Sequence, residues 1–401
     1  MDILYTIFTS IAILLFICVT PILVLIVRIY AGKSIQNPKY APVEGTVFHQ
    51  LLYFNRIYDY QTELAKKTPT FRLLAPEQSE TYTTDSRNVE HILKTNFGKY
   101  SKGKRNQEVI MDLFGEGIFA VDGEKWKQQR KLASFEFSAR VLRDFSCKVF
   151  RKGATKLVSK VFEFSLANQV FDMQELLMRC SLESIFKVGF GVDLNCLDGS
   201  SGDDNKFIKA FDDSNALSYW RYVDPLWKLK RYFNIGSELL LKNNIKFIRE
   251  FVDELIRTRR KQLEMKQDSD GRCADADDVL PDGFHIRKGD GVYYMSYAMG
   301  RMSYVWGNDA EDFRPERWLK DGIFQPESPF KFIAFHAGPR LCLGKDFAYR
   351  QMKILSMALL HFFRFKLSDD TKEVTYRTMF TLHIKEGLQV RAVLRRELVE
   401  A

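Results

Sequence analysis

Residues 335–344 read FHAGPRLCLG, and this stretch decides how the rest of the chain is interpreted. Gly338 and Gly344 bracket Cys342, so the backbone there can approach a bulky ligand without clashes from Cβ atoms. Cys342 directly precedes a long helical run, and the positive end of a helix favours a thiolate. Arg340 supplies a fixed cation for an acidic group. The pattern predicts a metal site with one protein ligand, the other ligands coming from a macrocycle; the alternative is a buried structural cysteine.

Three further motifs precede this stretch along the chain. Residues 313–318 read FRPERW and follow WGNDA at residues 306–310. The segment WKQQR carries Trp126 and Arg130, whose i,i+4 spacing places both side chains on one face of a helix. Arg272 follows Gly271 at the start of a β-rich region. Each motif alone is weak, because such residues are usually surface or packing positions.

Together and in this order, the motifs resemble the cytochrome P450 family, whose heme-binding loop follows F-x-x-G-x-R-x-C-x-G. The resemblance covers essentially the whole chain. It implies that heme b is the cofactor and that Cys342 is the axial ligand of its iron, in the thiolate arrangement that promotes O–O cleavage. It implies further contacts to the heme, several of them to its propionates, from Trp126, Arg130, Arg272, Phe335, Gly338, Arg340 and Gly344.

The pattern of the chain predicts a mainly α fold with a minor β region. Residues 50–266 are expected to be mostly helical, ending in an amphipathic helix with apolar residues from Ile245 to Leu263. Residues 278–297 alternate like strands between turns and predict a small β-sheet. A long helix is expected over residues 343–365, and a terminal hairpin over residues 375–390. Residues 46–401 are therefore expected to form one large domain with the cytochrome P450 fold.

Within the family, residues 117–126 (GIFAVDGEKW) and 306–344 most resemble the plant fatty-acid hydroxylase clan. That resemblance implies a lipophilic substrate, a long-chain fatty acid. It would contact residues that precede the WKQQR helix and residues in the terminal hairpin. The implied contacts are Leu113, Phe114, Phe119 and the hairpin residues Met379, Phe380 and Leu382. The alternative is that these side chains are ordinary core, and the 33 phenylalanines of the chain are compatible with both.

The N-terminus predicts a membrane anchor over residues 1–30, followed by a linker over residues 31–45. No charged residue lies from Ile3 to Val27, a length of about 37 Å as a helix. Basic residues follow the apolar run, which predicts that the bulk of the chain faces the cytosol from the endoplasmic reticulum membrane. A cleaved signal peptide is the alternative, but the apolar run is too long and lacks a cleavage site.

Net charge and composition limit the classes of molecule that the chain is expected to bind. The 401 residues carry a formal net charge of +9, and the six cysteines and six histidines form no zinc or redox motif. With a membrane anchor, lipid headgroups and an acidic protein explain the basic excess, so nucleic acid is excluded. The family resemblance implies electrons from NADPH only indirectly, through NADPH–cytochrome P450 reductase. The hypothetical docking patch for this reductase comprises Lys127, Lys131, Lys345, Arg350 and Lys353.

Two elements of the family are missing between residues 266 and 271. One is the long helix whose acidic residue and threonine deliver protons to bound dioxygen, so no catalytic acid–threonine pair is identifiable. The other is the helix with the E-x-x-R motif, which pairs with the arginine of FRPERW, Arg317. Glu254 and Arg257 match E-x-x-R but lie upstream, as a solvated helical pair. The sequence thus indicates an internal deletion of roughly a hundred residues, judged against ordinary domain lengths.

Two hypotheses for function follow. The first is a membrane-anchored oxidoreductase, a heme-thiolate monooxygenase that inserts one oxygen atom from O₂ into a C–H bond of a lipophilic substrate. The second is a truncated, non-catalytic P450 product that lacks the oxygen-activation helix. The motifs favour the first hypothesis for the family as a whole. The missing segment favours the second hypothesis for this particular chain.

Overall fold

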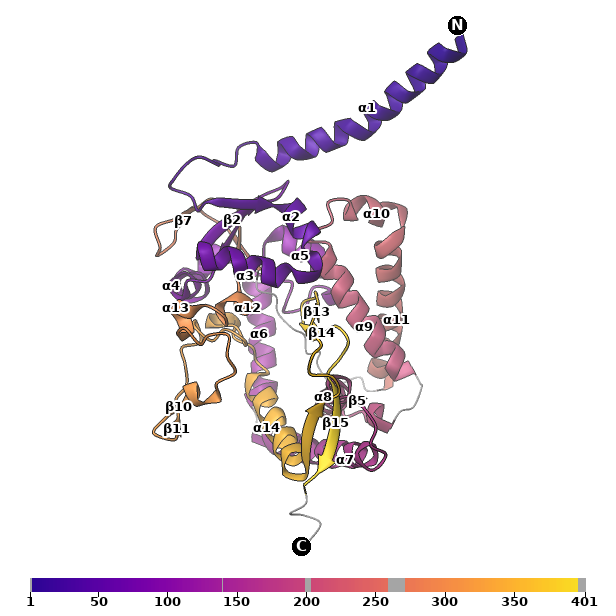
Figure 1. The fold of residues 1–401 in the computed structure, drawn as a ribbon, viewed down its shortest axis with the longest axis vertical. Coiled ribbons are helices and arrows are strands. Elements are labelled where there is room, and N and C mark those ends of the chain that lie inside the picture. Colours follow the sequence, from indigo (N-terminus) through magenta and orange to yellow (C-terminus); the bar gives the residue numbers. More distant parts are fainter. Residues whose placement is uncertain (1, 139, 199–202, 259–270, 396–401) are drawn as a thin grey trace. The chain divides into compact units, whose positions relative to one another are not determined.

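The fold was analysed in a computed structural model, which describes residues 2–138, 140–198, 203–258 and 271–395 (Figure 1). The chain divides into two compact units. Unit 1 comprises Met1–Gly103 and Asp270–Leu341, and unit 2 comprises Lys104–Ser269 and Cys342–Ala401. Both units are therefore built from two separate stretches of chain. The predicted deletion junction at residues 266–271 lies outside the described residues, except for Gly271.

Unit 1 is organised around a six-stranded sheet with the strand order β1-β2-β3-β9-β6-β4. Its strands are β1 (Val43–Thr46), β2 (Thr70–Leu74), β3 (Ser79–Thr83), β4 (Tyr100–Ser101), β6 (Gly271–Ala274) and β9 (Gly291–Tyr294). Two-stranded ribbons pair β7 (Asp278–Val279) with β8 (His285–Ile286) and β10 (Leu319–Lys320) with β11 (Ile323–Phe324). The helices are α1 (Asp2–Tyr30), α2 (Val47–Leu52), α3 (Ile57–Lys67), α4 (Ser86–Glu90), α12 (Ser296–Met299) and α13 (Ser303–Trp306).

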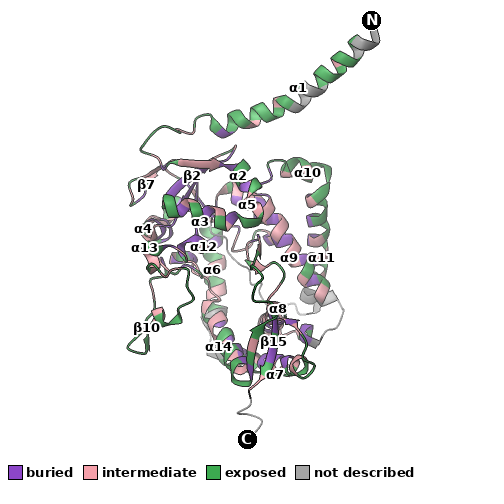
Figure 2. Cartoon of the chain, viewed as in Figure 1, coloured by how far each residue is buried: buried purple, intermediate pink, exposed green. Residues whose placement is uncertain are grey.

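This sheet corrects two sequence predictions. Strands β2 and β3 lie in a region that was expected to be mostly helical, and every residue of both strands is buried (Figure 2). The β region after residue 271 is also no separate sheet, because β9 pairs with β3 and β6. Short strands that are buried on both faces carry little alternation, and the pairing of β3 with β9 joins residues about 210 positions apart. The mainly helical character of the chain is confirmed.

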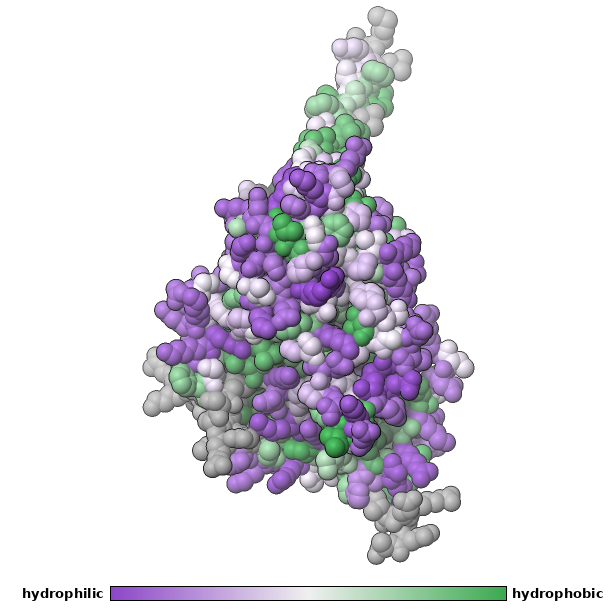
Figure 3. All heavy atoms as spheres, turned by 90° about the vertical axis from the view of Figure 1, so that its left-hand side faces the viewer, coloured by the Kyte–Doolittle hydropathy of each residue, from purple (hydrophilic) through white to green (hydrophobic). Residues whose placement is uncertain are grey.

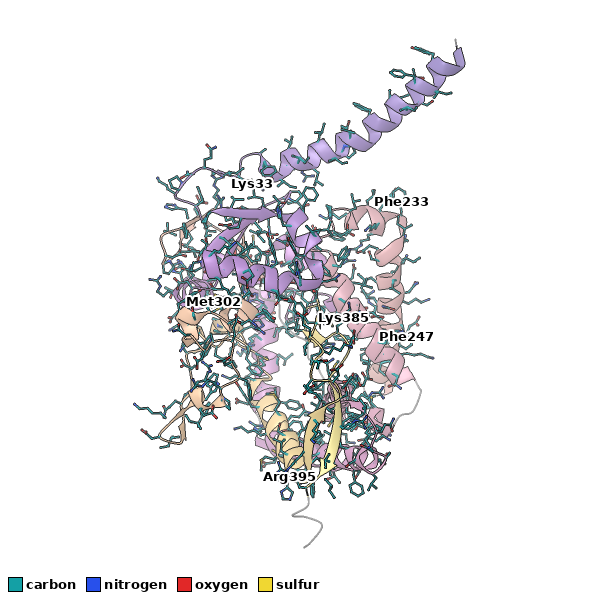
Figure 4. All side chains as sticks on the ribbon, in the orientation of Figure 1. Lys33, Phe233, Phe247, Met302, Lys385 and Arg395 are labelled. Carbon is teal, nitrogen blue, oxygen red and sulfur yellow. The ribbon has the colours of Figure 1, made fainter. Side chains whose placement is uncertain are left out.

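The predicted linker after α1 is held against the sheet of unit 1 by two arginines. Arg72 of β2 donates from Nε to the carbonyl of Ala41 (2.7 Å) and from Nη1 to that of Lys33 (2.8 Å), which Figure 4 labels. Arg287 donates from Nε to the hydroxyl of Tyr40 (2.9 Å). Both guanidinium groups also lie over the Tyr40 ring, at 5.4 and 4.6 Å from its centroid. The linker is thus a fixed strap rather than a free tether.

We expect Arg72→Gln to expose this strap to trypsin. The buried guanidinium makes several hydrogen bonds to the strap, and losing two or three of them costs about 2–3 kcal/mol of local stability. Cleavage after Lys33 and Lys39, followed by mass spectrometry, should therefore accelerate at least about tenfold. Arg87→Gln is the control, because Arg87 is exposed and pairs only locally with Asp85. Equal cleavage rates in both variants would contradict the prediction.

Unit 2 is mainly helical. Its helices are α5 (Gly103–Phe114), α6 (Gly123–Ser138), α7 (Arg140–Leu166), α8 (Met173–Phe190), α9 (Asp203–Trp220), α10 (Trp227–Phe233), α11 (Gly236–Thr258) and α14 (Lys345–Phe362). A three-stranded sheet has the order β12-β15-β5, with β12 (Phe363–Leu367), β15 (Gln389–Leu394) and β5 (Phe171–Asp172). The predicted terminal hairpin is present as β13 (Tyr376–Arg377) and β14 (His383–Ile384).

Two buried clusters hold unit 2 together. One joins α7, α8 and α14 to the three-stranded sheet around Leu157, Leu355 and Phe363. The other packs α9 against α11, which lie side by side in Figure 1, with the rings of Phe207 and Phe251 stacked at 4.6 Å. The helix predicted over residues 343–365 ends earlier, at Phe362. The alternating sequence FRFKL that follows it forms β12 instead, since alternation buries one side of a strand.

Helix α1 contains Pro21 and carries exposed apolar residues, including Phe8, Phe16 and Leu23. Figure 3 shows apolar residues in green along this N-terminal helix. At its C-terminal end, Ile29 is buried against Val47 and Leu74 of unit 1. Within the ranges that the structure describes, no helix is both long enough and apolar enough to cross a membrane.

Candidate functional site

The stretch FHAGPRLCLG crosses the boundary between the two units. Phe335, Gly338 and Arg340 belong to unit 1, whereas Cys342 and Gly344 belong to unit 2. In unit 1, residues Gly338–Arg340 form a short 3-10 helix. Gly338 has a φ of +67°, and a Cβ atom there would lie 1.8 Å from the carbonyl oxygen of Leu93. Glycine is therefore required at this position by close contact with the protein backbone, as well as by its conformation.

Two arginines predicted to contact the cofactor are buried within unit 1. Arg272 is fully buried on β6, where its Nη1 donates to the carbonyl of Gly271 (2.9 Å) and its guanidinium lies 6.0 Å from the Tyr294 ring. Arg340 is also buried, at the end of the 3-10 helix. Since a guanidinium remains charged when buried, each is suited to bind an anionic group. Phe335 is half-buried.

Cys342 lies at the start of the second stretch of unit 2, three residues before α14 begins at Lys345. Its thiol is partly exposed, and the backbone N–H of Lys345 donates to its carbonyl (3.4 Å). Gly344 is the residue at the N-terminal cap of α14. The helix itself is fixed by the edge-on packing of Phe347 on Phe150 of α7, with ring centroids 4.7 Å apart. Cys342 thus lies just before the positive end of a firmly packed helix.

Helix α6 carries the Trp126 and Arg130 pair in unit 2. Trp126 is buried and Arg130, one turn later, is half-buried. The spacing places both side chains on one face of α6, as predicted. Helix α6 also carries two lysines of the hypothetical docking patch, Lys127 and Lys131, both exposed. Lys127 pairs with Glu124 at 2.5 Å, so its charge is partly compensated.

Comparisons with known proteins decide the family. The family model for cytochrome P450 matches residues 36–275 and 269–390. Cytochrome P450 704C1 of Pinus taeda is 39% identical over 480 aligned positions, which cover 89% of this chain and 92% of the relative. Cytochromes P450 704B1 and 94B3 of Arabidopsis thaliana are 33% and 30% identical, covering 95% and 94% of the relatives. The chain belongs to the cytochrome P450 family. The predicted family is therefore confirmed.

The same comparisons locate the missing segment of this P450. The two matches of the family model meet at residues 269–275, where the sequence predicts the deletion junction. The alignment with the pine relative spans 480 positions, although this chain has only 401 residues in all. More than nine tenths of each of the three relatives is nevertheless covered, so the difference is internal. The chain thus lacks a central segment that its relatives possess.

Arg317 of this P450 is expected to pair with residues of the missing segment, and its guanidinium forms other hydrogen bonds instead. Its Nη1 donates to the carbonyl of Trp306 (3.1 Å), and its Nη2 donates to that of Asp309 (2.8 Å). The Asp309 carboxylate lies 3.7 Å from Nη1. The guanidinium is therefore bound by carbonyls of its own segment. The upstream match to E-x-x-R, Glu254 and Arg257, has side chains outside the described part of the structure.

The residues present fit a heme. Family membership implies a heme-thiolate cofactor, and its thiolate needs one cysteine that water or a ligand can reach. Cys342 meets this requirement, whereas the thiol of Cys180 is buried and burial raises its pKa to about 12. Within the described residues, no group of three or more His, Cys, Asp and Glu side chains could hold a metal ion by itself. In unit 2, Cys342 supplies the one thiolate that a heme requires, and in unit 1 the buried Arg272 and Arg340 are cations of the kind that bind propionates.

Most of the predicted substrate residues lie together in unit 2. Phe114 of α5 is buried, with its ring centroid 6.0 Å from that of Phe119 and 6.2 Å from that of Phe380. Leu113 packs on the same cluster. Met379 is fully buried, whereas Leu382 is 45% exposed. The structure therefore joins the segment before α6 to the tip of the terminal hairpin, which leaves Leu382 as the outlying member.

The side chains that hold this hairpin were not among the site residues predicted from the sequence. Asn215 of α9 accepts a hydrogen bond at Oδ1 from the backbone N–H of Phe380 (2.8 Å). Arg377 of β13 pairs with Asp213 (2.7 Å). Gln174 of α8 bonds to both the N–H and the carbonyl of Ile384, at 2.9 and 3.0 Å. Polar residues within a helical pattern are usually assigned to solvent, so no local signal distinguishes these three from surface positions.

Asp212, next to this anchoring group, has a perturbed carboxyl. Burial raises the pKa of Asp212 to about 6, with Arg377 opposing the rise and Asp213 and Glu175 adding to it. Its pKa in the unfolded chain is the ordinary value near 3.8. The ionised form is therefore disfavoured in the folded protein. This cost is absent below the unfolded pKa, grows between the two values and is complete above about pH 6.

We expect Asp212→Asn to stabilise the folded chain at pH 7.5. The amide removes the cost of burying a carboxylate, so the urea midpoint of the variant should exceed that of the parent. The difference should shrink as the pH is lowered through 6 and vanish below about 4, because Asp212 is then neutral in both states. Circular dichroism at several pH values measures it. A pH-independent difference would show that lost packing, not ionisation, is responsible.

Proposed function

We propose that the chain functions as a heme-thiolate monooxygenase that inserts one oxygen atom from O₂ into a C–H bond of a long-chain fatty acid. The second oxygen atom leaves as water; its two electrons come from NADPH through the reductase, and its two protons come from NADPH and from solvent. The observation that carries the substrate class is the aromatic cluster of Phe114, Phe119 and Phe380 in unit 2. An aliphatic chain buries well against such rings.

Each site residue has a stated role in this proposal. Cys342 would ligate the heme iron as a thiolate, while Arg130, Arg340 and Arg272 would hold the propionates. Bound heme supplies the redox chemistry that activates O₂. The aromatic cluster would exclude water and hold the substrate. The residues that deliver protons in the family belong to the missing helix, so this chain offers no catalytic acid–threonine pair.

A second candidate is supported by the missing segment itself. A P450 chain without that segment lacks the general-acid pathway that ordinarily contributes about 10²- to 10⁴-fold to the rate of a reaction. Such a chain could retain heme, lipid substrate or reductase contacts without turnover. The second candidate is therefore a non-catalytic form of the same protein.

A carbon monoxide difference spectrum separates these candidates from a chain that does not assemble. Membranes that contain the full chain are reduced with dithionite and exposed to carbon monoxide. We expect a thiolate-type Soret band, and its absence would contradict heme binding by this polypeptide. Hydroxylated product formed from labelled fatty acid, NADPH and reductase would support the monooxygenase. A band without product would support the non-catalytic form.

The proposed partner is NADPH–cytochrome P450 reductase, docked on the patch of Lys127, Lys131, Lys345, Arg350 and Lys353. These side chains lie on α6 and α14, and Lys353 is exposed. Charge reversal at Lys345 and Lys353 should weaken reductase binding about tenfold at low salt, because each charge attracts an acidic surface. Lys366→Glu on β12 is a matched control in the same unit. Unchanged binding by the double variant would count against this patch.

The proposed location is the endoplasmic reticulum membrane, with a single N-terminal anchor and the bulk of the chain in the cytosol. The charge-free run Ile3–Val27 and the basic residues Arg28, Lys33 and Lys39 after it support this location. Carbonate extraction of cell membranes tests it. Recovery of the chain in the carbonate supernatant would argue against an anchor, whereas retention in the pellet would support one.

A further inference from the structure

Asn215 lies on α9 and reaches the tip of the terminal hairpin. The residue is only 2% exposed. Oδ1 accepts a hydrogen bond from the backbone N–H of Phe380 (2.8 Å), and Nδ2 donates to Oγ1 of Thr381 (3.2 Å). One buried amide therefore uses both of its polar groups on two successive residues of the tip. Because an unbonded buried amide is costly, this geometry is strongly preferred.

Phe380, which Asn215 holds, belongs to the aromatic cluster, and its ring also contacts two tyrosines outside that cluster. The Phe380 ring lies 6.2 Å from Phe114, 5.3 Å from Tyr219 and 6.1 Å from Tyr222, measured between centroids. All of these contacts are edge-on, which is a favourable arrangement for aromatic pairs. Tyr219 lies one turn after Asn215 on the same helix. Helix α9 thus fixes both the backbone and the ring of Phe380.

The base of the hairpin has separate anchors. Gln174 holds the backbone of Ile384, and Asp213 holds Arg377. These contacts fix the two short strands, while Asn215 fixes the loop between them. Loss of Asn215 would consequently free the tip while the strands stay in place. That separation allows the position of Phe380 to be altered without removing the hairpin.

We propose that Asn215 is a positioning residue that sets where Phe380 meets the aliphatic chain of the substrate, and so sets the preferred chain length. The inference rests on the proposed function, because it takes the aromatic cluster as the surface that the fatty acid contacts. Each methylene that gains or loses contact with Phe380 changes affinity by about fourfold. A displacement of the ring by the length of one methylene is therefore enough to change selectivity measurably.

The test measures fatty-acid binding and needs no turnover. The full chain is placed in lipid nanodiscs with a dansyl-labelled fatty acid, which is displaced by saturated acids of 12, 14, 16 and 18 carbons. Empty nanodiscs give the background from partition into lipid. Asn215→Leu removes both hydrogen bonds, and Asn215→Asp keeps the acceptor for Phe380. Ser214→Ala is the control, because Ser214 is a buried neighbour on the same helix.

We expect Asn215→Leu to change the affinity ratio between the best and the worst chain length by at least about fourfold. Asn215→Asp should restore most of the parent ratio, and Ser214→Ala should leave it unchanged even if it lowers the unfolding temperature. An unaltered ratio in Asn215→Leu would overturn the positioning role. If no saturated acid displaces the probe from the parent chain, the proposed substrate class itself is wrong. If Asn215→Leu fails to fold, Asn215→Ala takes its place, because it also removes both hydrogen bonds but adds no bulk, and an unaltered ratio there overturns the inference.

Discussion

Replacing Cys342 with alanine is expected to abolish the thiolate-type band of the reduced, carbon monoxide-bound chain. Alanine offers no ligand for iron, and within the described residues no other cysteine is both partly exposed and placed just before a packed helix. The expected loss is complete rather than partial, because the band reports the iron–sulfur bond directly. Absorbance near the Soret maximum, normalised to chain concentration, measures it.

Two further variants show that the loss reflects ligation and not misfolding. Cys342→His offers an imidazole, which is an alternative ligand of heme iron, so heme should be retained with a band of a different type. Cys147→Ala is the matched control, since Cys147 is partly exposed on α7 of the same unit. A normal thiolate band in Cys342→Ala would disprove the assignment of the ligand. Loss of the band in Cys147→Ala would point to a folding defect instead.

The second large effect is expected from restoring the missing segment. The segment of the pine relative that aligns opposite the gap can be inserted between Lys266 and Gly271. The rate of fatty-acid hydroxylation should then rise at least about a hundredfold above that of the present chain, because the insertion returns the proton-delivering pair to the site. Product formed with NADPH, reductase and labelled fatty acid gives the rate.

The control for this insertion is the same chimera with Cys342→Ala, which should stay inactive because the heme ligand is absent. A chimera that shows the thiolate band but no gain in rate would contradict the role assigned to the segment. A parent chain that is already as fast as the chimera would reject the non-catalytic candidate. The two measurements together thus separate cofactor binding from oxygen activation.

Much of the candidate site could be predicted from short stretches of chain. Cys342, its bracketing glycines and the Trp126 and Arg130 pair are recognisable because the chemistry depends on spacing within one loop or one helix turn. The terminal hairpin was also predictable, since its strand and turn signals are local. Strands β2 and β3 were not, because a strand buried on both faces lacks the alternation that marks a half-buried one.

Gly338 must be glycine for a reason that its neighbours in the sequence do not show. The sequence shows a glycine beside a ligand loop, which suggested room for a bulky ligand. The structure shows the carbonyl of Leu93 at 1.8 Å from where a Cβ atom would stand. No sequence signal relates residues 338 and 93, because their approach depends on how the intervening chain folds. Asn215 is a similar case, since it meets Phe380 across 165 positions.

The sequence by itself identified the family, predicted Cys342 as the heme ligand and indicated that a central segment is absent from this chain. These properties are set by which residues are present and by their spacing along the chain. Only the tertiary structure decided which side chains hold the terminal hairpin, why Gly338 must be glycine and how Arg72 fastens the linker. Those contacts join residues far apart in the chain, and packing alone determines which distant residues meet.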